Sequence, residues 1–459
     1  MPAWIYNWWN KLRSSLWLIP SCMAIAAVFL SQVVPYLDDM LSPKTIHSLE
    51  WLGNMGPEGA MTLLSTIAGS MITIAGVVFS ITIVALALAS SQFGPRLLGN
   101  FMRDRGNQVV LGTFVATFLY CLLVLRTIHI KSSGEYTPYW GTLVGLLLAI
   151  CSLGVLIYFM HHIAVSIQAP NLIAAVYAEL EEDLTRLFPE HLGKEEKNRT
   201  KREMIQEIMA RIEKEGMDIR AHIGGYLQAV ENKALMEIAR EQNLVVFLHY
   251  RPGHFITKGA SLAKILALGP MADLVSQPIN KQMICGTNRT QEQDIEFSVL
   301  QLVEVAVRAL SPGINDPFTC IHCIDHLSAI LCQLGQREFP SPYRYDSEGV
   351  LRVIAPSVTF EGVMNAAFNQ IRQHGKGNVA VIICLLEGLG RIGETVVRND
   401  DRKAIHRHVE MLQRGSRESI QEKNDLEAVE DRCRQVMSLL SNGENRSFLS
   451  MDKMSKFLP

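Results

Sequence analysis

Long apolar runs are concentrated in the first third of the chain, and they predict membrane helices. Four of them exceed the roughly 18 residues that an apolar helix needs to cross a bilayer. We place the predicted spans at residues 15–36, 60–91, 108–128 and 139–163. The rest of the chain has the mixed apolar and polar pattern of a soluble protein. We therefore expect a mainly α membrane protein, in which a four-helix transmembrane domain is followed by an α+β soluble region.

The second predicted span carries its small and hydroxylated residues on one side. No charged residue lies between Glu58 and Arg96, and small residues recur there in alternating steps of three and four, which aligns them on one face of a helix. This seam consists of Gly59, Thr62, Thr66, Gly69, Thr73, Gly76 and Ser80. The opposite face carries Leu64, Ile67, Met71, Ile74 and Val78. We expect lipid on the bulky face, and either a closely packed helix or a wet path along the seam.

The second span is also longer than a bilayer requires. At about 1.5 Å per residue, a helix over residues 60–91 extends about 48 Å, against a hydrocarbon core of roughly 30 Å. We expect this helix to tilt or to project beyond the bilayer.

Lysine and arginine residues predict the orientation of the spans. Lys11 and Arg13 precede the first span and three arginines follow the second, whereas the loops on the other side carry fewer cations. The positive-inside rule then places both termini in the cytoplasm. A cleaved signal peptide is the alternative for the first run, but its length and Pro35 favour a retained anchor.

Charge narrows the class of protein. The formal net charge is −2 over 459 residues, so there is no basic footprint for nucleic acid. No span has a charged residue in its apolar middle, where proton-coupled carriers usually need one. His161 and His162 end the fourth span, and they are either interfacial side chains or a gate, a pH sensor or a metal contact. The nine cysteines are scattered, which suits free thiols in a reducing compartment.

The soluble region divides into three predicted parts after the transmembrane domain of residues 1–168. Residues 169–216 have the pattern of a charged helical connector. Residues 217–292 form a predicted small β-rich subdomain, and residues 293–459 a mostly helical cytoplasmic subdomain.

One turn in the β-rich part has a recognisable pattern. The segment Arg251-Pro-Gly-His-Phe-Ile-Thr-Lys-Gly259 resembles the turn of lipoyl- and biotinyl-type small β-barrels. The resemblance implies a small β-barrel-like subdomain. Lys258 lies inside the turn rather than at a hairpin tip, which favours a structural module over a modified carrier.

Two polar segments are candidates for a ligand or an interface. Asp316 precedes Pro317, as at a capped helix start, but capping does not explain Asn315. A helix start at this point can also hold an anion. Arg289 lies among many hydrogen-bonding residues, which favours a domain or subunit contact, with a phosphate-type ligand as the alternative. Arg289, Asn315 and Asp316 are therefore candidate ligand or interface residues.

Two apparent motifs are better explained by helix packing. Cys320, Cys323 and His326 are spaced for one zinc ion, but no second Cys/His pair lies nearby to complete the site. Residues 388–393 match the dinucleotide fingerprint formally, but charged helical sequence follows them instead of a second strand. Catalytic constellations are not evident either. We expect no enzyme activity, no catalytic residue, no metal and no cofactor.

Four blocks carry a resemblance to a known family: residues 76–82, 89–98, 161–164 and 309–317. Their order and residues resemble a bacterial family of predicted integral membrane proteins of unknown function. The resemblance covers nearly the whole chain. It implies an inner (plasma) membrane protein with a cytoplasmic C-terminal part, and it implies no activity, cofactor or catalytic residue.

The leading functional hypothesis is a homo-oligomeric channel-like or transport protein with a cytoplasmic assembly or regulatory domain. Its partners would be the lipid bilayer and further copies of the chain, and its ligand is unknown. The alternative is a membrane-anchored ligand-sensing or scaffold protein without a permeation path. A membrane-bound enzyme is a third hypothesis, with only the cysteine and histidine cluster behind it.

Overall fold

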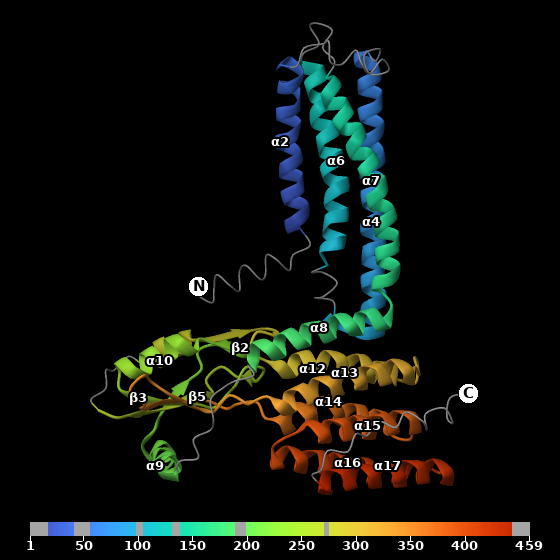
Figure 1. The fold of residues 1–459 in the computed structure, drawn as a ribbon. Coiled ribbons are helices and arrows are strands. Elements are labelled where there is room, and N and C mark those ends of the chain that lie inside the picture. The colour runs from blue at the N-terminus through green and yellow to red at the C-terminus, as the bar shows by residue number, and fades with distance from the viewer. Residues whose placement is uncertain are drawn as a thin grey trace. The chain divides into compact units, whose positions relative to one another are not determined.

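The chain divides into two compact units in a computed structural model, unit 1 from Met1 to Leu172 and unit 2 from Ile173 to Pro459 (Figure 1). The structure describes residues 17–40, 56–97, 104–130, 138–188, 199–269 and 275–442. Lys11 and Arg13, on which the predicted orientation depends, lie outside the described residues.

Unit 1 is a bundle of helices that correspond to the four predicted spans (Figure 1). The helices are α2 (Leu18–Met40), α4 (Pro57–Phe93), α6 (Arg105–Ile130) and α7 (Tyr139–Ser166), with a short 3-10 turn η2 (Pro95–Leu97) after α4. Helix α6 packs against the other three helices. By length and composition α4, α6 and α7 can cross a membrane, and the apolar part of α2 with described side chains is the shorter Leu18–Val34.

The interior of the bundle is filled by large apolar side chains. Large buried side chains include Leu64 from α4, Phe114 and Tyr120 from α6, and Phe159 from α7. The Tyr120 hydroxyl donates a hydrogen bond of 3.1 Å to the carbonyl of Gly141. This core holds α4, α6 and α7 together within the chain.

The outer faces of the bundle are also apolar. Large exposed hydrophobic residues occur on all four of its helices, among them Phe29 on α2, Ile72 on α4, Leu122 on α6 and Ile157 on α7. A surface of this kind is costly in water and is expected of helices in contact with lipid tails. The bundle therefore has the surface of a membrane domain.

Unit 2 begins with two helices and two small sheets. The helices before and between the strands are α8 (Ala169–Leu187), α9 (Arg199–Glu215), α10 (Asn232–Glu241) and α11 (Ser276–Lys281). The larger sheet has the order β1 (Met217–Arg220), β5 (Ser261–Ala267), β3 (Leu244–Leu248), β8 (Leu351–Ile354) and β7 (Tyr343–Tyr345). The smaller has the order β4 (Phe255–Ile256), β2 (Gly225–Val230) and β6 (Met283–Gly286).

Neither sheet closes into a barrel within the described residues, so the expected β-barrel-like subdomain is wrong. The reason lies in pairing that the local turn pattern does not reveal. The central strand β3 pairs antiparallel with β5 and parallel with β8, for example Val246 with Val353. The sheet thus joins strands from both sides of the predicted boundary at residue 292, and its apolar side is covered by residues such as Leu235 of α10.

The remaining helices of unit 2 lie roughly parallel to one another (Figure 1). They are α12 (Ile295–Ala309), α13 (Pro317–Gln336), α14 (Phe360–His374), α15 (Val379–Thr395), α16 (Asn399–Ser419) and α17 (Lys423–Asn442). Asp294, Asp316, Thr359 and Asn378 each cap a helix by accepting a backbone N–H with the side chain. Polar residues just before apolar periodic segments therefore start these helices, as capping chemistry requires.

Helix α13 is apolar and long enough to cross a membrane by composition, although it was expected in the soluble region. Half of its most apolar window is buried inside the structure, where it packs against α12 and α15. Its polar residue Asp325 pairs with Arg391 at 2.8 Å. We interpret α13 as a core helix of unit 2.

Helix α8 packs onto the other helices of unit 2. Its charged sequence had suggested instead a helix surrounded by solvent. Leu180 and Leu184 are fully buried. Asp183 accepts a hydrogen bond of 2.6 Å from Ser298 in α12, and Arg337 donates one of 2.7 Å to the carbonyl of Phe188. The acidic cluster in this segment thus contributes a buried helix contact.

Candidate functional site

The seam of α4 lies on the outside of unit 1. Thr62, Thr66, Gly69, Thr73, Gly76 and Ser80 are all exposed, whereas Leu64, Ile67, Met71 and Val78 on the opposite face are buried. The expectation that the bulky face contacts lipid is therefore wrong. Its side chains fill the core against α6 and α7, because large apolar residues provide the contacts that hold the bundle together.

The glycines of unit 1 fall into two groups. A Cβ atom at Gly145 would lie 2.8 Å from Leu64 Cδ2, and one at Gly112 would lie 3.2 Å from the Pro20 backbone, so these glycines permit close helix contacts. By contrast, no atom lies within 4 Å of a Cβ placed at Gly69 or Gly76. The two seam glycines therefore have no packing role within the described part of the chain.

The threonines of the seam satisfy their own donors. Thr62 donates to the carbonyl of Glu58 at 2.8 Å, Thr66 to that of Thr62 at 2.7 Å, and Thr73 to that of Gly69 at 2.8 Å. Such bonds to the preceding turn leave the hydroxyl oxygens as acceptors on the surface. The seam thus consists of small side chains and is weakly polar. Its threonine hydroxyls all have an acceptor in their own helix.

The two histidines at the end of α7 differ in their surroundings. His161 is exposed. His162 Nε2 lies 2.5 Å from the Asp104 carboxylate, which precedes α6, and its ring stacks on Tyr158. Asp104 also accepts the backbone N–H of Gly106 at 2.8 Å. His162 therefore ties the end of α7 to the start of α6, and a role of either histidine as a gate or sensor stays a prediction.

Arg289 is engaged within unit 2. Its Nε donates to Asp294 at 2.8 Å, and the same carboxylate group caps α12 through the Phe297 N–H. Burial raises the pKa of Asp294, against the effect of Arg289. Beside this pair, Arg251 in the predicted turn contacts Glu296 at 2.7 Å. Arg289 therefore helps join the turn at 251–254 to the start of α12, and a contact to another subunit stays a prediction.

The segment before α13 forms the expected capped start. Asp316 accepts the Thr319 N–H at 3.1 Å and the Thr319 hydroxyl at 2.6 Å. The hydrogen bond from the Thr319 hydroxyl is the main reason why the pKa of Asp316 is lowered. Asn315 has a φ of 50°, a left-handed conformation that asparagine tolerates better than most residues. Backbone geometry thus explains Asn315, and a ligand role for either residue stays a prediction.

The cysteine and histidine side chains of the motif on α13 lie in different surroundings. Cys320 and Cys323 are fully buried, whereas His326 packs against the Tyr177 ring of α8 at 4.6 Å between centroids. No cluster of three or more metal-ligating side chains occurs in the part of the chain that the structure describes. Residues 388–393 lie within helix α15, where Gly388 allows close contact with Ser328 of α13.

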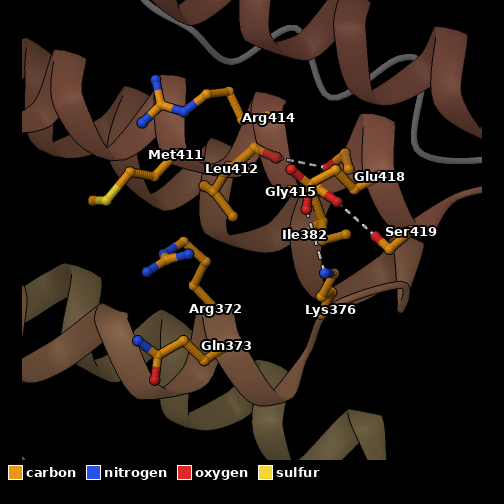
Figure 2. Close-up of a pocket in the computed structure, with 11 residues that line it drawn as sticks. Arg372, Gln373, Lys376, Ile382, Met411, Leu412, Arg414, Gly415, Glu418 and Ser419 are labelled. Atoms are coloured by element: carbon orange, nitrogen blue, oxygen red, sulfur yellow. Dashed lines mark hydrogen bonds and ion pairs between the residues drawn. The ribbon is translucent and has the colours of Figure 1, made fainter.

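One site was not found from the sequence. A cavity of about 340 Å³ lies beside helices α14 and α16, and Arg372, Lys376 and Arg414 contribute its positive charge (Figure 2). Arg372 and Lys376 lie at the end of α14 and just after it, whereas Arg414 comes from α16, and in the sequence each resembles an ordinary solvated side chain. Finding this cavity requires knowing that α14 packs against α16, and the local sequence pattern does not show which helices pack together.

The apolar bundle of unit 1 defines a multi-pass membrane protein, and the mixed helices and sheets of unit 2 follow it in the chain. The chain belongs to a family of predicted membrane proteins, DUF2254, whose sequence model matches residues 13–391. The resemblance inferred from the four sequence blocks is thereby confirmed.

Relatives occur in mycobacteria. An uncharacterised protein of Mycobacterium bovis and one of Mycobacterium tuberculosis are each 30% identical to this chain over 421 residues, covering 91% of this chain and 79% of the relative. No solved structure matches the chain.

Proposed function

We propose that this protein is a homo-oligomeric, channel-like or transport protein of the bacterial inner membrane, with both termini in the cytoplasm and unit 2 as its assembly or regulatory domain. The observation that carries the proposal is the exposed seam of α4, with Gly69 and Gly76 unpacked at its centre. The uncharged length of α4 supports it.

The chemistry of the seam favours a second copy of the same helix as its partner. Glycine in a helix interior is destabilising by roughly 0.5–1 kcal/mol relative to alanine, so two unpacked glycines on one face need another purpose. Small residues in this spacing allow membrane helices to approach closely. Several copies arranged about a symmetry axis would bring their α4 seams together, and their hydroxyl oxygens would face that axis.

The test combines conductance with subunit number. Purified protein in planar bilayers should conduct ions, and Thr73→Phe or Gly76→Leu should alter the conductance or dissociate the oligomer. Gly154→Leu is the matched control, because Gly154 is an exposed glycine of α7, and a Cβ placed there also has no atom within 4 Å. This control should leave both properties unchanged. Silent bilayers across ions and pH, together with a monomeric particle, would refute the proposal.

A second candidate is a membrane-anchored ligand-sensing or scaffold protein. The cation-lined cavity of unit 2 favours it, because such a cavity can bind a ligand without any path through the membrane. The two functions differ in one measurement. A scaffold would oligomerise through the seam, and lose that property in Gly76→Leu, while its bilayers stay silent.

A further inference from the structure

The cavity beside α14 and α16 has the size of a small-molecule site. Its volume of about 340 Å³ is at the lower end of the range of roughly 300–1,000 Å³ for ligand pockets. Three lining residues are cationic, Arg372, Lys376 and Arg414, and Glu418 is the one carboxylate among the lining residues. The lining therefore carries two net positive charges.

The carboxylates near the cavity do not neutralise it. Lys376 Nζ lies 3.5 Å from Glu418, and Arg414 lies 3.8 Å from Glu410. All four side chains are well exposed, and exposed pairs of this kind contribute little. An anionic ligand can therefore recruit Lys376 and Arg414 at little cost.

Arg372 is the distinctive residue of the site. Its Nε is buried, and it has no hydrogen-bond partner within the described part of the chain. A buried donor without a partner is destabilising, and a phosphate that pairs with the terminal nitrogens of this guanidinium would offset that cost. Figure 2 shows the nitrogen-bearing ends of Arg372, Gln373 and Arg414 toward the left of the view, and Lys376 toward the right, near Glu418.

The positive potential extends into the protein interior. Burial first, and then the charges of Arg372 and Arg407, lower the pKa of His408 to about 4. Arg407 has a carboxylate partner in Glu361. His408 is fully buried and contacts Asn365 through Nε2 at 2.9 Å. The neutral His408 ring thus lies within the electrostatic field of the Arg372 guanidinium. Arg372 therefore acts both on the cavity and on the protein interior.

Gly415 keeps the wall of the cavity open. It lies within helix α16, where glycine is less favourable than alanine, yet no atom lies within 4 Å of a Cβ placed there. Helix packing therefore does not explain this glycine. A side chain at this position would point into free space at the cavity.

We infer that this cavity is a binding site for a phosphate group, carried either by a small soluble molecule or by a lipid headgroup. Arginine matches phosphate through paired N–H donors, and Lys376 supplies a point charge. A dianionic phosphate would balance the two net positive charges of the lining and accept a hydrogen bond from Arg372. The site belongs to unit 2 alone, so it does not depend on conduction through unit 1.

The experiment is calorimetric titration of the full chain in an uncharged detergent at low salt. One arm uses inorganic phosphate, and the other uses glycerol 3-phosphate as a lipid-headgroup fragment. Saturable binding in either arm is expected, and the tighter arm identifies the source of the phosphate. Arg372→Gln should weaken binding by about tenfold or more, because a hydrogen bond to a charged group is lost.

Two further variants separate a built site from general attraction to cations. Gly415→Leu keeps every charge but fills the cavity, and it should abolish binding. Lys403→Gln removes an exposed charge from the same helix, one that already pairs with Asp400 at 2.8 Å, and binding should be unchanged.

Three results would overturn the inference. The first is the absence of saturable binding in both arms. The second is unchanged binding in Arg372→Gln and Gly415→Leu when both variants unfold at or above the wild-type temperature. The third is an equal loss in Lys403→Gln, which would indicate non-specific attraction.

Discussion

At the scale of single residues, glycines carry much of the information, because each one marks either a close contact or an open space. Gly388 in α15 and Gly415 in α16 both lie inside helices of unit 2. A Cβ at Gly388 would collide with the Ser328 hydroxyl, whereas one at Gly415 would meet nothing within 4 Å. The same residue type thus has opposite consequences in neighbouring helices.

This contrast gives a paired stability prediction. Gly415→Ala should stabilise unit 2 by about 0.5–1 kcal/mol, since alanine loses less backbone entropy in a helix. Gly388→Ala should destabilise it by about 1–3 kcal/mol, because the added methyl group overpacks the contact between α13 and α15. Chemical denaturation of the full chain in detergent measures both. An equal effect of the two substitutions would contradict this assignment.

Asp316 gives a prediction with a pH dependence. Replacing it with alanine removes the cap of α13 and should cost about 1 kcal/mol at neutral pH. Because the folded-state pKa of Asp316 is lowered, its contribution is present above its ordinary pKa and is lost as pH falls through the folded-state value. The difference between wild type and Asp316→Ala in thermal unfolding should therefore shrink in acid. A difference that grows in acid would contradict a lowered folded-state pKa of Asp316.

At the scale of elements, the sequence predicted helices well and their surroundings poorly. Neighbouring residues in the sequence determine helix starts such as Asp316–Pro317. They also determine that α4 has one face of small residues and one of bulky residues. Which face turns inward depends on α6 and α7, and the pairing of β3 with β8 depends on strands far apart in the chain. Local periodicity carries neither kind of information, which is why the barrel, the lipid-facing side and the cavity were mispredicted or missed.

Helices α4 and α7 provide a prediction that separates folding from assembly. Gly145→Leu should destabilise unit 1 itself, because the new side chain would overlap Leu64 in the contact between α7 and α4. Gly69→Leu should leave the protomer folded, because its Cβ has no neighbour within 4 Å, and should reduce the subunit number instead. Thermal unfolding and particle mass in the same detergent distinguish the two effects. Loss of the fold in Gly69→Leu would contradict the outward position of the seam.

At the scale of the whole molecule, the proposed orientation can be tested independently of the proposed transport function. A fluorescent protein that matures only in the cytoplasm, fused after residue 459, should fluoresce in bacterial cells. A phosphatase that is active only in the periplasm should be inactive at the same position. The reverse pattern would place the C-terminus in the periplasm and contradict the topology that the cation bias predicts.

The parallel pair of β3 and β8 has a consequence for synthesis. When the ribosome has released β3 and β5, one edge of β3 has no partner until residues 351–354 emerge, after α12 and α13 have been made. An open strand edge invites association with other chains. Nascent protein therefore passes through a vulnerable interval, and truncation between α13 and β8 should aggregate more readily than truncation after residue 354.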